Sequence, residues 1–421
     1  MKASLKYLKV FTILIASFFA FSILISWIPD KRMRNNIERS LPELLEDGNY
    51  PKAILKGDKY RQDSFTDALI LNIIISSDSK KPVESALSNP YSFHYPNDPH
   101  CWYAVLHLDH KLQNMDLKPN WFYGRYWFGS VFVTKILFLV ITYQQIKWLL
   151  YIVSTLLLLI FSVKIVNRVG WIKSLPIFLA LLFANFFVTQ FSIQFFPVMS
   201  IALIGGVWMC KNGLEPQKKL TMFFFIVGIF TAYFDLLTTP MLTLGLPLVV
   251  YLILQGEEKK SFWALFKSMF ILCSFWLIGF VCAWSIKWLL VIFFSDSTTL
   301  YAIEAIKWRT DTGDYTRWDA IVVNFNLLPV VWFNLLLTFL FFLTIFSFNK
   351  RGIPLAMVLL IVGLFPYIWY FVLSSHSYDH WWFTYRAQII SMSCAMLFFV
   401  SLTDWERLKL RLKAIISKSQ C

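Results

Sequence analysis

The sequence predicts an all-α membrane protein with about ten transmembrane helices, a large first external loop and a helix lying on the membrane surface. Of the 421 residues, 57% are hydrophobic and only 15% are charged, whereas a soluble domain has roughly 45–50% apolar and about 25% charged residues. The apolar residues occur in long runs, as membrane-spanning helices require. The frequent Phe and Trp suit lipid-facing surfaces and interfacial belts. These observations exclude a soluble enzyme.

The net charge of +14 does not indicate a nucleic-acid partner, because most Lys and Arg flank apolar runs and do not gather on one soluble face. Such flanking charges set the orientation of membrane helices. Of the six cysteines, only Cys101 lies in the expected external loop, so a disulfide framework is not expected there. The sequence contains no CxxC motif and no His/Cys cluster, so it does not predict a metal site of that kind.

The lysines before the first apolar run orient the chain. Lys2, Lys6 and Lys9 place the N-terminus in the cytoplasm. Residues 1–28 are then expected to form the first transmembrane helix, and residues 29–127 an external loop domain.

The next apolar stretch, 128–142, is short and carries Lys135. If it crossed the membrane, Lys164, Arg168 and Lys173 would lie outside, against the rule that basic loops stay in the cytoplasm. We therefore expect an interfacial helix on the outer leaflet.

Residues 143–403 are predicted to contain transmembrane helices 2–10, because every short basic loop then falls on one side. These nine spans are expected near residues 147–167, 174–190, 194–210, 220–236, 239–254, 268–294, 329–347, 353–374 and 387–403. A second external loop, 295–328, is polar but carries no specific motif. The basic segment 404–421 is expected to lie on anionic lipid at the cytoplasmic face.

Two carboxylates begin the most suggestive segment of the external domain. Asp63 and Asp67 are four residues apart, share one face of a helix that Ser64 or Thr66 could cap, and precede an apolar run. Such carboxylates can act as a general base or bind a divalent cation such as Mg²⁺ or Mn²⁺. The alternative is a solvated pair that favours a helix N-terminus. No other cofactor is expected.

The segment WFYGRYWFG, residues 121–129, contains an arginine surrounded by aromatic residues. Arg125 is flanked by Tyr123 and Tyr126. An arginine at headgroup level is a natural phosphate ligand, whereas the rings alone could anchor the chain at the interface.

Two charged residues occur at or within the expected spans. Asp235, in FDLLTTP, lies at the outer end of an expected span, where a carboxylate close to the membrane is energetically costly. It therefore indicates either a functional site or a short polar turn. Lys287 lies in an otherwise apolar span. It could hold a lipid phosphate or extend to the interface.

The short outer loop HSYDHWWFTYR, residues 376–386, is unusually polar. His376 and His380 are spaced to share a helix face, but a third metal ligand is missing. Together with Arg386 they predict phosphate or sugar binding.

These segments resemble the GT-C superfamily of integral-membrane glycosyltransferases, which combine many spans with a large first external loop and interfacial helices. YGRYWFG, FDLLTTP and SYDHWWFTYR also resemble segments of a poorly characterised group of bacterial polytopic membrane proteins with this layout. The resemblance implies an inverting glycosyltransferase of the bacterial inner membrane, with its active site on the periplasmic face. It also implies a polyprenyl-phosphate sugar donor, a glycan or lipid-linked acceptor, and Asp63 or Asp67 as the acid that acts on the acceptor.

Two other classes remain open. An O-antigen-type polysaccharide polymerase or ligase also spans the membrane many times, but usually carries its largest loop late in the chain. A transporter of lipid-linked saccharides would show inverted repeats and midplane charges. The polar candidates here collect at the outer face, so we expect most of them to line one cavity there.

Overall fold

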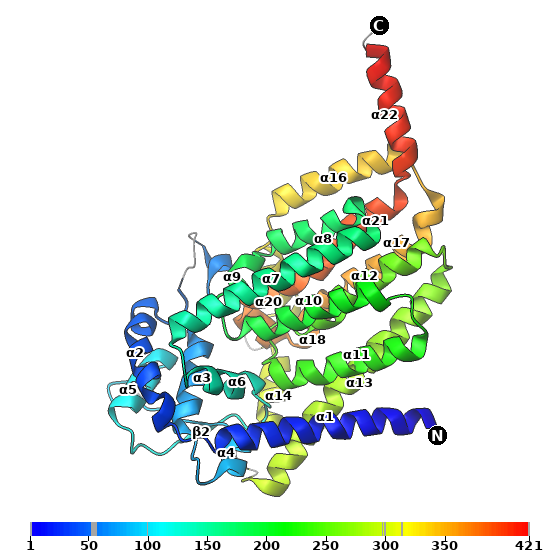
Figure 1. Ribbon diagram of the computed structural model, residues 1–421. Helices are drawn as coiled ribbons and strands as arrows, with labels where there is room; N and C mark the ends of the chain where they lie inside the picture. The colour runs from blue at the N-terminus through cyan, green and yellow to red at the C-terminus, as the bar shows by residue number, and fades with distance from the viewer. Residues whose placement is uncertain are drawn as a thin grey trace.

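The regular structure of the protein is almost entirely helical, as the sequence predicts (Figure 1). The computed structural model describes residues 2–51, 57–98, 100–296, 298, 300–312 and 315–419. Within them, helices account for nearly all regular structure. Two-residue strands, β1 (Pro90–Tyr91) and β2 (Trp121–Phe122), pair antiparallel with Pro90 opposite Phe122.

Long helices lie side by side in a bundle (Figure 1). Six segments are long and apolar enough to cross a membrane: Ser4–Ser26, Tyr143–Val169, Phe195–Asn212, Phe262–Phe294, Lys350–Val372 and Trp381–Leu402. They correspond to α1 (Lys2–Ser26), α7 (Tyr143–Val169), α10 (Phe195–Asn212), α13 (Phe262–Phe294), α17 with α18 (Ile353–Gly363, Phe365–Val372), and α20 with α21 (Trp381–Thr384, Ile389–Leu402). A seventh is added if α15 (Arg317–Phe325) and α16 (Val330–Phe346), bent by 80°, count as one span.

The expected count of about ten spans is therefore too high for the described residues. The helix α8 (Trp171–Phe183) has 13 residues and α12 (Met241–Glu257) has 17. At about 1.5 Å per residue they reach roughly 20 and 25 Å, short of a hydrocarbon core of about 30 Å. A third expected span, α11 (Gln217–Phe234), begins with the polar residues QKK. Residues 241–255 of α12 are all buried by protein, so its apolar character reflects core packing.

The segment that was expected to form the external domain packs as a small helical unit at one end of the bundle (Figure 1), and the name external domain is kept for it. It contains α2 (Lys31–Asp47), α3 (Ser64–Ser76), α4 (Pro82–Ser88) and α5 (Ala104–Gln113). The apolar helix α3 lies at its centre, in contact with α2, α5 and β1. Of the expected interfacial stretch 128–142, α6 (Gly129–Leu137) forms a nine-residue helix that packs on α1, α3 and α11.

The remaining helices connect or extend these layers. They are η1 (Asp58–Tyr60), α9 (Phe186–Thr189), α14 (Ala302–Thr310), η3 (Lys350–Gly352), α19 (Ser374–Asp379), η4 (Tyr385–Gln388) and α22 (Trp405–Ser419). The basic helix α22 projects from the end of the bundle that lies away from the external domain, and the N-terminus lies at that end too (Figure 1). The N-terminal end of α1 and the helix α22 thus lie at one end of the bundle, and α2 to α5 lie at the other (Figure 1).

Close helix packing depends on two glycines. A Cβ atom at Gly228 of α11 would lie 2.1 Å from the carbonyl oxygen of Trp276, and one at Gly279 of α13 would lie 2.2 Å from that of Phe225. Small residues permit such backbone approach between membrane helices. The two helices are thereby locked along their length.

Replacing Gly279 by Ala is expected to lower the free energy of unfolding by ~1–3 kcal/mol, because the added methyl group must push the two helix backbones apart. The shift can be measured as a lower melting temperature in detergent. Leu277→Ala is the control, since Leu277 lies on the same helix and is 54% exposed. Equal melting temperatures for Gly279→Ala and the wild type would contradict this close packing.

Candidate functional site

Asp63 caps the N-terminus of α3. Its Oδ1 accepts the backbone N–H of Thr66 at 2.9 Å, and the residue is only 2% exposed. A carboxylate is stabilised there by unpaired N–H groups and by the helix dipole. The expectation that Ser64 or Thr66 caps the helix was wrong, because Asp63 is itself a strong capping residue one position earlier.

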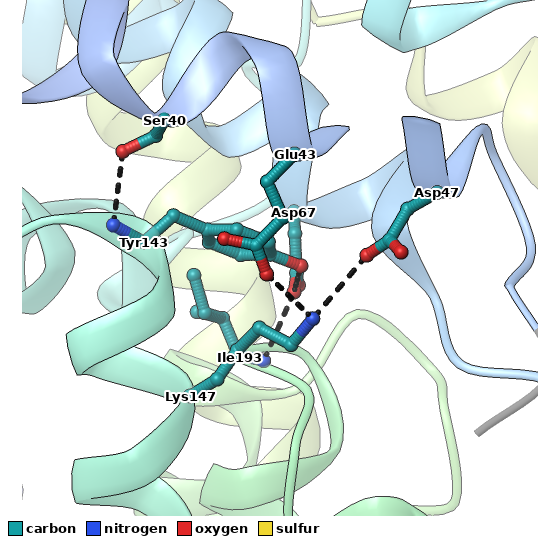
Figure 2. A network of polar contacts seen from close by, with 7 residues as sticks. All are labelled: Ser40, Glu43, Asp47, Asp67, Tyr143, Lys147 and Ile193. Atoms are coloured by element: carbon teal, nitrogen blue, oxygen red, sulfur yellow. Dashed lines mark hydrogen bonds and ion pairs between the residues drawn. The ribbon is translucent and has the colours of Figure 1, made fainter. Parts of the chain in front are cut away.

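Asp67 lies one turn further along α3 and is buried against α7 and the segment before α10 (Figure 2). Its Oδ2 accepts the Tyr143 hydroxyl at 2.8 Å and the backbone N–H of Ile193 at 3.4 Å. Its Oδ1 is buried without a hydrogen-bond partner. One oxygen is thus fixed in place while the other keeps unused hydrogen-bonding capacity.

The first turns of α7 are anchored to α2, which holds Tyr143 in position (Figure 2). Ser40 Oγ accepts the backbone N–H of Tyr143 at 3.0 Å. Lys147 Nζ lies 3.1 Å from a carboxylate oxygen of Glu43 and 3.3 Å from one of Asp47. The Lys147 side chain is only 12% exposed, so solvent screens these pairs less than it screens an exposed pair. The external domain and the bundle are therefore joined beside the buried carboxylate.

The pKa values of the two carboxylic acids are both raised, and they differ from each other. Burial raises the pKa of Asp63 to about 6, against the opposing effect of its Thr66 hydrogen bonds and the Arg386 charge. Burial and the neighbouring Asp63 raise the pKa of Asp67 to about 8. Both carboxylates therefore hold a proton to higher pH than an exposed aspartic acid does, and Asp67 more so than Asp63. Two acids with separated pKa values can divide the roles of base and hydrogen-bond donor.

Arg386 lies near Asp63 in the fully buried η4 segment. Its guanidinium donates to the carbonyl oxygens of Trp382 at 3.2 Å and Lys59 at 3.3 Å, and its Nε has no hydrogen-bond partner. The carbonyl of Lys59 also accepts the Tyr385 hydroxyl at 3.2 Å. The cation thus ties η1 to η4 and contributes positive charge close to the carboxylate pair.

An apolar groove of about 260 Å³ lies next to the Asp67 site, although neither Asp63 nor Asp67 lines it. It is lined by α6, α7, α10 and the end of α11, and it includes Ile193, whose N–H binds Asp67. The groove opens toward the bundle surface, since its lining residues Val133 and Ile204 are 40% and 53% exposed. Its walls suit a hydrocarbon chain much better than a polar ligand.

A second cluster is formed around Arg125, in the aromatic-rich segment 121–129. The Arg125 guanidinium lies 4.9 Å from the ring centre of Tyr123 and 5.2 Å from that of Tyr126. Arg309, from α14, reaches the same place and donates to the Tyr126 hydroxyl. The sequence singled out three of these four residues. Arg309 was missed because it lies in the loop 295–328, whose sequence carries no specific motif.

Asp235 and His376 lie between the two clusters. Asp235 follows α11, its Oδ1 accepts the backbone N–H of Thr238 at 3.0 Å, and Thr238 in turn accepts the Gln194 amide at 3.0 Å. Burial raises the pKa of Asp235 to about 7. His376 Nε2 donates to the carbonyl of Leu237 at 2.8 Å. Because Gln194 is next to Ile193, these contacts connect Asp67 with the histidine loop.

Lys287 has a different environment from the one expected. Its ammonium donates to the carbonyl oxygens of Ala86 at 3.2 Å and Leu87 at 2.8 Å, at the end of α4, and lies over the Trp127 ring. It is fully buried. The structure therefore places it as a tie between α13 and the external domain.

The expected single cavity is divided into an acidic site and a basic cluster. Asp63, Asp67 and Arg386 come together in the acidic site, with Tyr143 as an additional residue. Arg125, Tyr123, Tyr126 and His380 lie in or beside the basic cluster, with Arg309 as an addition. Among the described residues, no group of three or more His, Cys, Asp or Glu is placed to hold a metal ion.

Comparison of the chain with protein-family models, curated protein sequences and solved structures finds no match.

Proposed function

We propose that the protein is a membrane glycosyltransferase that transfers a sugar from a polyprenyl-phosphate donor to an external glycan or lipid-linked acceptor. The observation that carries the proposal is the position of the buried pair Asp63 and Asp67 beside an apolar groove open to the bundle surface. The proposed site is the periplasmic face of a bacterial inner membrane. The multi-pass helical architecture supports a substrate that arrives through the bilayer.

The proposed chemistry needs a base and stabilisation of a phosphate leaving group. The acceptor hydroxyl oxygen attacks C1 of the sugar, the bond between C1 and the phosphate oxygen breaks, and the hydroxyl proton passes to Asp63. Asp63 suits this role because its pKa of about 6 leaves it ionised at pH 7. Protonated Asp67 can donate through Oδ1 and orient the acceptor. Arg386 contributes positive charge nearby.

The apolar groove supports the lipid half of the substrate. Its walls are almost wholly hydrocarbon, and they include Ile193, whose backbone N–H contacts Asp67. Part of a prenyl chain can fill this volume without burying a polar group. We propose that a chain held there has its phosphate end toward the carboxylates, which is the orientation that transfer requires.

The direct test is sugar transfer by the purified protein in lipid nanodiscs. A panel of radiolabelled polyprenyl-phosphate sugars is offered with membrane glycans and lipid-linked acceptors. The proposal predicts release of polyprenyl phosphate and labelling of an acceptor with inverted anomeric configuration. If no donor in a panel covering the common hexoses, pentoses and amino sugars is consumed, the proposed activity is wrong.

The pH dependence of transfer should be bell-shaped. Below about pH 6, kcat/KM should fall as Asp63 becomes protonated, and above about pH 8 it should fall as Asp67 loses its proton. Asp67→Asn should abolish only the alkaline limb, because an amide remains a donor at high pH. The measurement is kcat/KM from pH 5 to 9. An alkaline limb that survives in Asp67→Asn would assign that limb to another group.

A further inference from the structure

Two arginines from distant parts of the chain converge on one tyrosine. Arg125 lies in the external domain, and Arg309 ends the helix α14, which follows the long helix α13. The guanidinium carbons lie 5.2 and 5.6 Å from the Tyr126 ring centre, and Arg309 also donates to the Tyr126 hydroxyl. The charge of Arg125 acts on Arg309, so the two cations are near neighbours.

Neither arginine has a counter-charge within the part of the chain that the structure describes. The ion pairs found there involve other Lys and Arg residues. The Nε atoms of Arg125 and Arg309 are both buried without hydrogen-bond partners. Two like charges in a half-buried site repel, and their unused N–H groups are costly. A bound anion would offset both effects.

The position of Arg309 is set by several contacts. Ser374 Oγ donates to the carbonyl oxygens of Thr310 and Asp311 at 3.4 and 3.2 Å, which fixes the end of α14 on α19. Tyr315 stacks on Tyr378 at a centroid distance of 3.9 Å. These contacts fix the position of the end of α14, which carries the Arg309 guanidinium.

The neighbouring histidines add neutral hydrogen-bonding groups. Burial, helped by the Arg309 charge, lowers the pKa of His380 to about 4 and that of His376 well below its usual value. Both rings are therefore neutral at pH 7. His376 Nδ1 is buried without a partner, and it is an acceptor in the neutral ring because Nε2 carries the proton that is donated to the Leu237 carbonyl. The titratable groups that act on Arg309 are Arg125 and two tyrosines and include no carboxylate, so the cluster favours an anion over a cation.

We propose that Arg125 and Arg309, held around Tyr126, bind a phosphate or pyrophosphate group. Guanidinium groups match the oxygen geometry of phosphate and can each make two parallel hydrogen bonds. The group could belong to a lipid or to a free anion. Its assignment to a lipid-linked substrate rests on the proposed function, whereas anion binding itself does not.

The test measures anion binding to the purified full-length protein. Tryptophan fluorescence follows thermal unfolding in increasing inorganic pyrophosphate, with sodium chloride at matched ionic strength. A second arm compares nanodiscs with and without polyprenyl phosphate in a phosphatidylcholine background. Pyrophosphate or the lipid should stabilise the wild type. Arg309→Gln and Arg125→Gln should each weaken the apparent affinity by roughly 10- to 100-fold.

Matched controls separate this site from general electrostatics. Lys307→Gln removes the same charge from an exposed position on α14, and Lys118→Gln does so in the external domain; neither should change the affinity. Arg309→Lys keeps the charge but not the planar fork, and should bind more weakly than the wild type. The melting temperature without ligand reports whether each variant folds.

The outcomes distinguish this proposal from the glycosyltransferase proposal. Stabilisation by pyrophosphate and lipid alike identifies the phosphate group as the ligand, and stabilisation by the lipid alone identifies a lipid phosphate. Equal binding by the wild type and both Gln variants, or no stabilisation in either arm, overturns the anion site. Arginine-dependent binding without sugar transfer from any donor would leave the anion site standing and refute the proposed activity.

Discussion

Replacing Asp63 by Asn is expected to lower kcat for sugar transfer by roughly 10²- to 10⁴-fold, the usual cost of losing a general base. The variant should fold, because Asn is an N-cap as favourable as Asp and can still accept the Thr66 N–H. The loss should therefore appear in turnover and not in yield or melting temperature. Steady-state transfer in nanodiscs with the best donor of the panel measures it.

The matched control is Asp78→Asn. Asp78 lies in the same external domain, is exposed and also accepts a local backbone N–H, from Lys80 at 2.8 Å. Its replacement should leave turnover unchanged. If Asp63→Asn retains full turnover and Asp67→Asn loses it, the base is Asp67. If both retain it, Asp235 becomes the leading candidate.

Filling the apolar groove should produce the second large effect. Ser200 lines the groove from α10, is 8% exposed, and its Oγ has no hydrogen-bond partner. In Ser200→Trp the indole would occupy much of the volume that the prenyl chain needs. We expect kcat/KM for a long-chain donor to fall roughly 10- to 100-fold, which corresponds to losing the burial of about two or three CH₂ groups at about 0.8 kcal/mol each.

The length of the donor chain makes this test specific. A water-soluble donor with one or two isoprene units should be affected much less by Ser200→Trp than the long-chain donor. Leu156→Trp is the control, because Leu156 lies on α7 outside the groove lining and is 53% exposed. An equal loss for short and long donors would indicate distortion of the active site and would argue against the groove as the chain-binding site.

Helical class and membrane character could be predicted from the sequence because long apolar runs flanked by lysines are typical of membrane helices and rare in soluble domains. The span count could not. Apolar runs in α8 and α12 resemble spans, but one is too short and the other is covered by protein on all sides. Hydropathy reports that a residue avoids water, and it does not report whether lipid or protein surrounds it.

The site shows the same limit at the level of single residues. Asp63 and Asp67 could be selected because their spacing is local and their helix is apolar. Tyr143 could not, since its partner Asp67 is distant in sequence and a tyrosine at the start of an apolar run looks like an interfacial anchor. Lys287 was expected either to hold a lipid phosphate or to extend to the interface, but its partners are carbonyl oxygens at the end of α4. Carbonyl groups at a helix end carry no charge, so the sequence does not reveal them as partners.

The distance along the chain between Asp63 and Arg386 has a consequence for biosynthesis. Roughly 320 residues separate the first half of the acidic site from the second, and at about 5–20 residues per second their synthesis takes roughly 15–65 s. During that interval Asp63 and Asp67 have left the ribosome, while the arginine has not yet been made. The Asp67 contacts with Tyr143 and Ile193 can form before Arg386 is made. The acidic site is complete only when the last helices arrive.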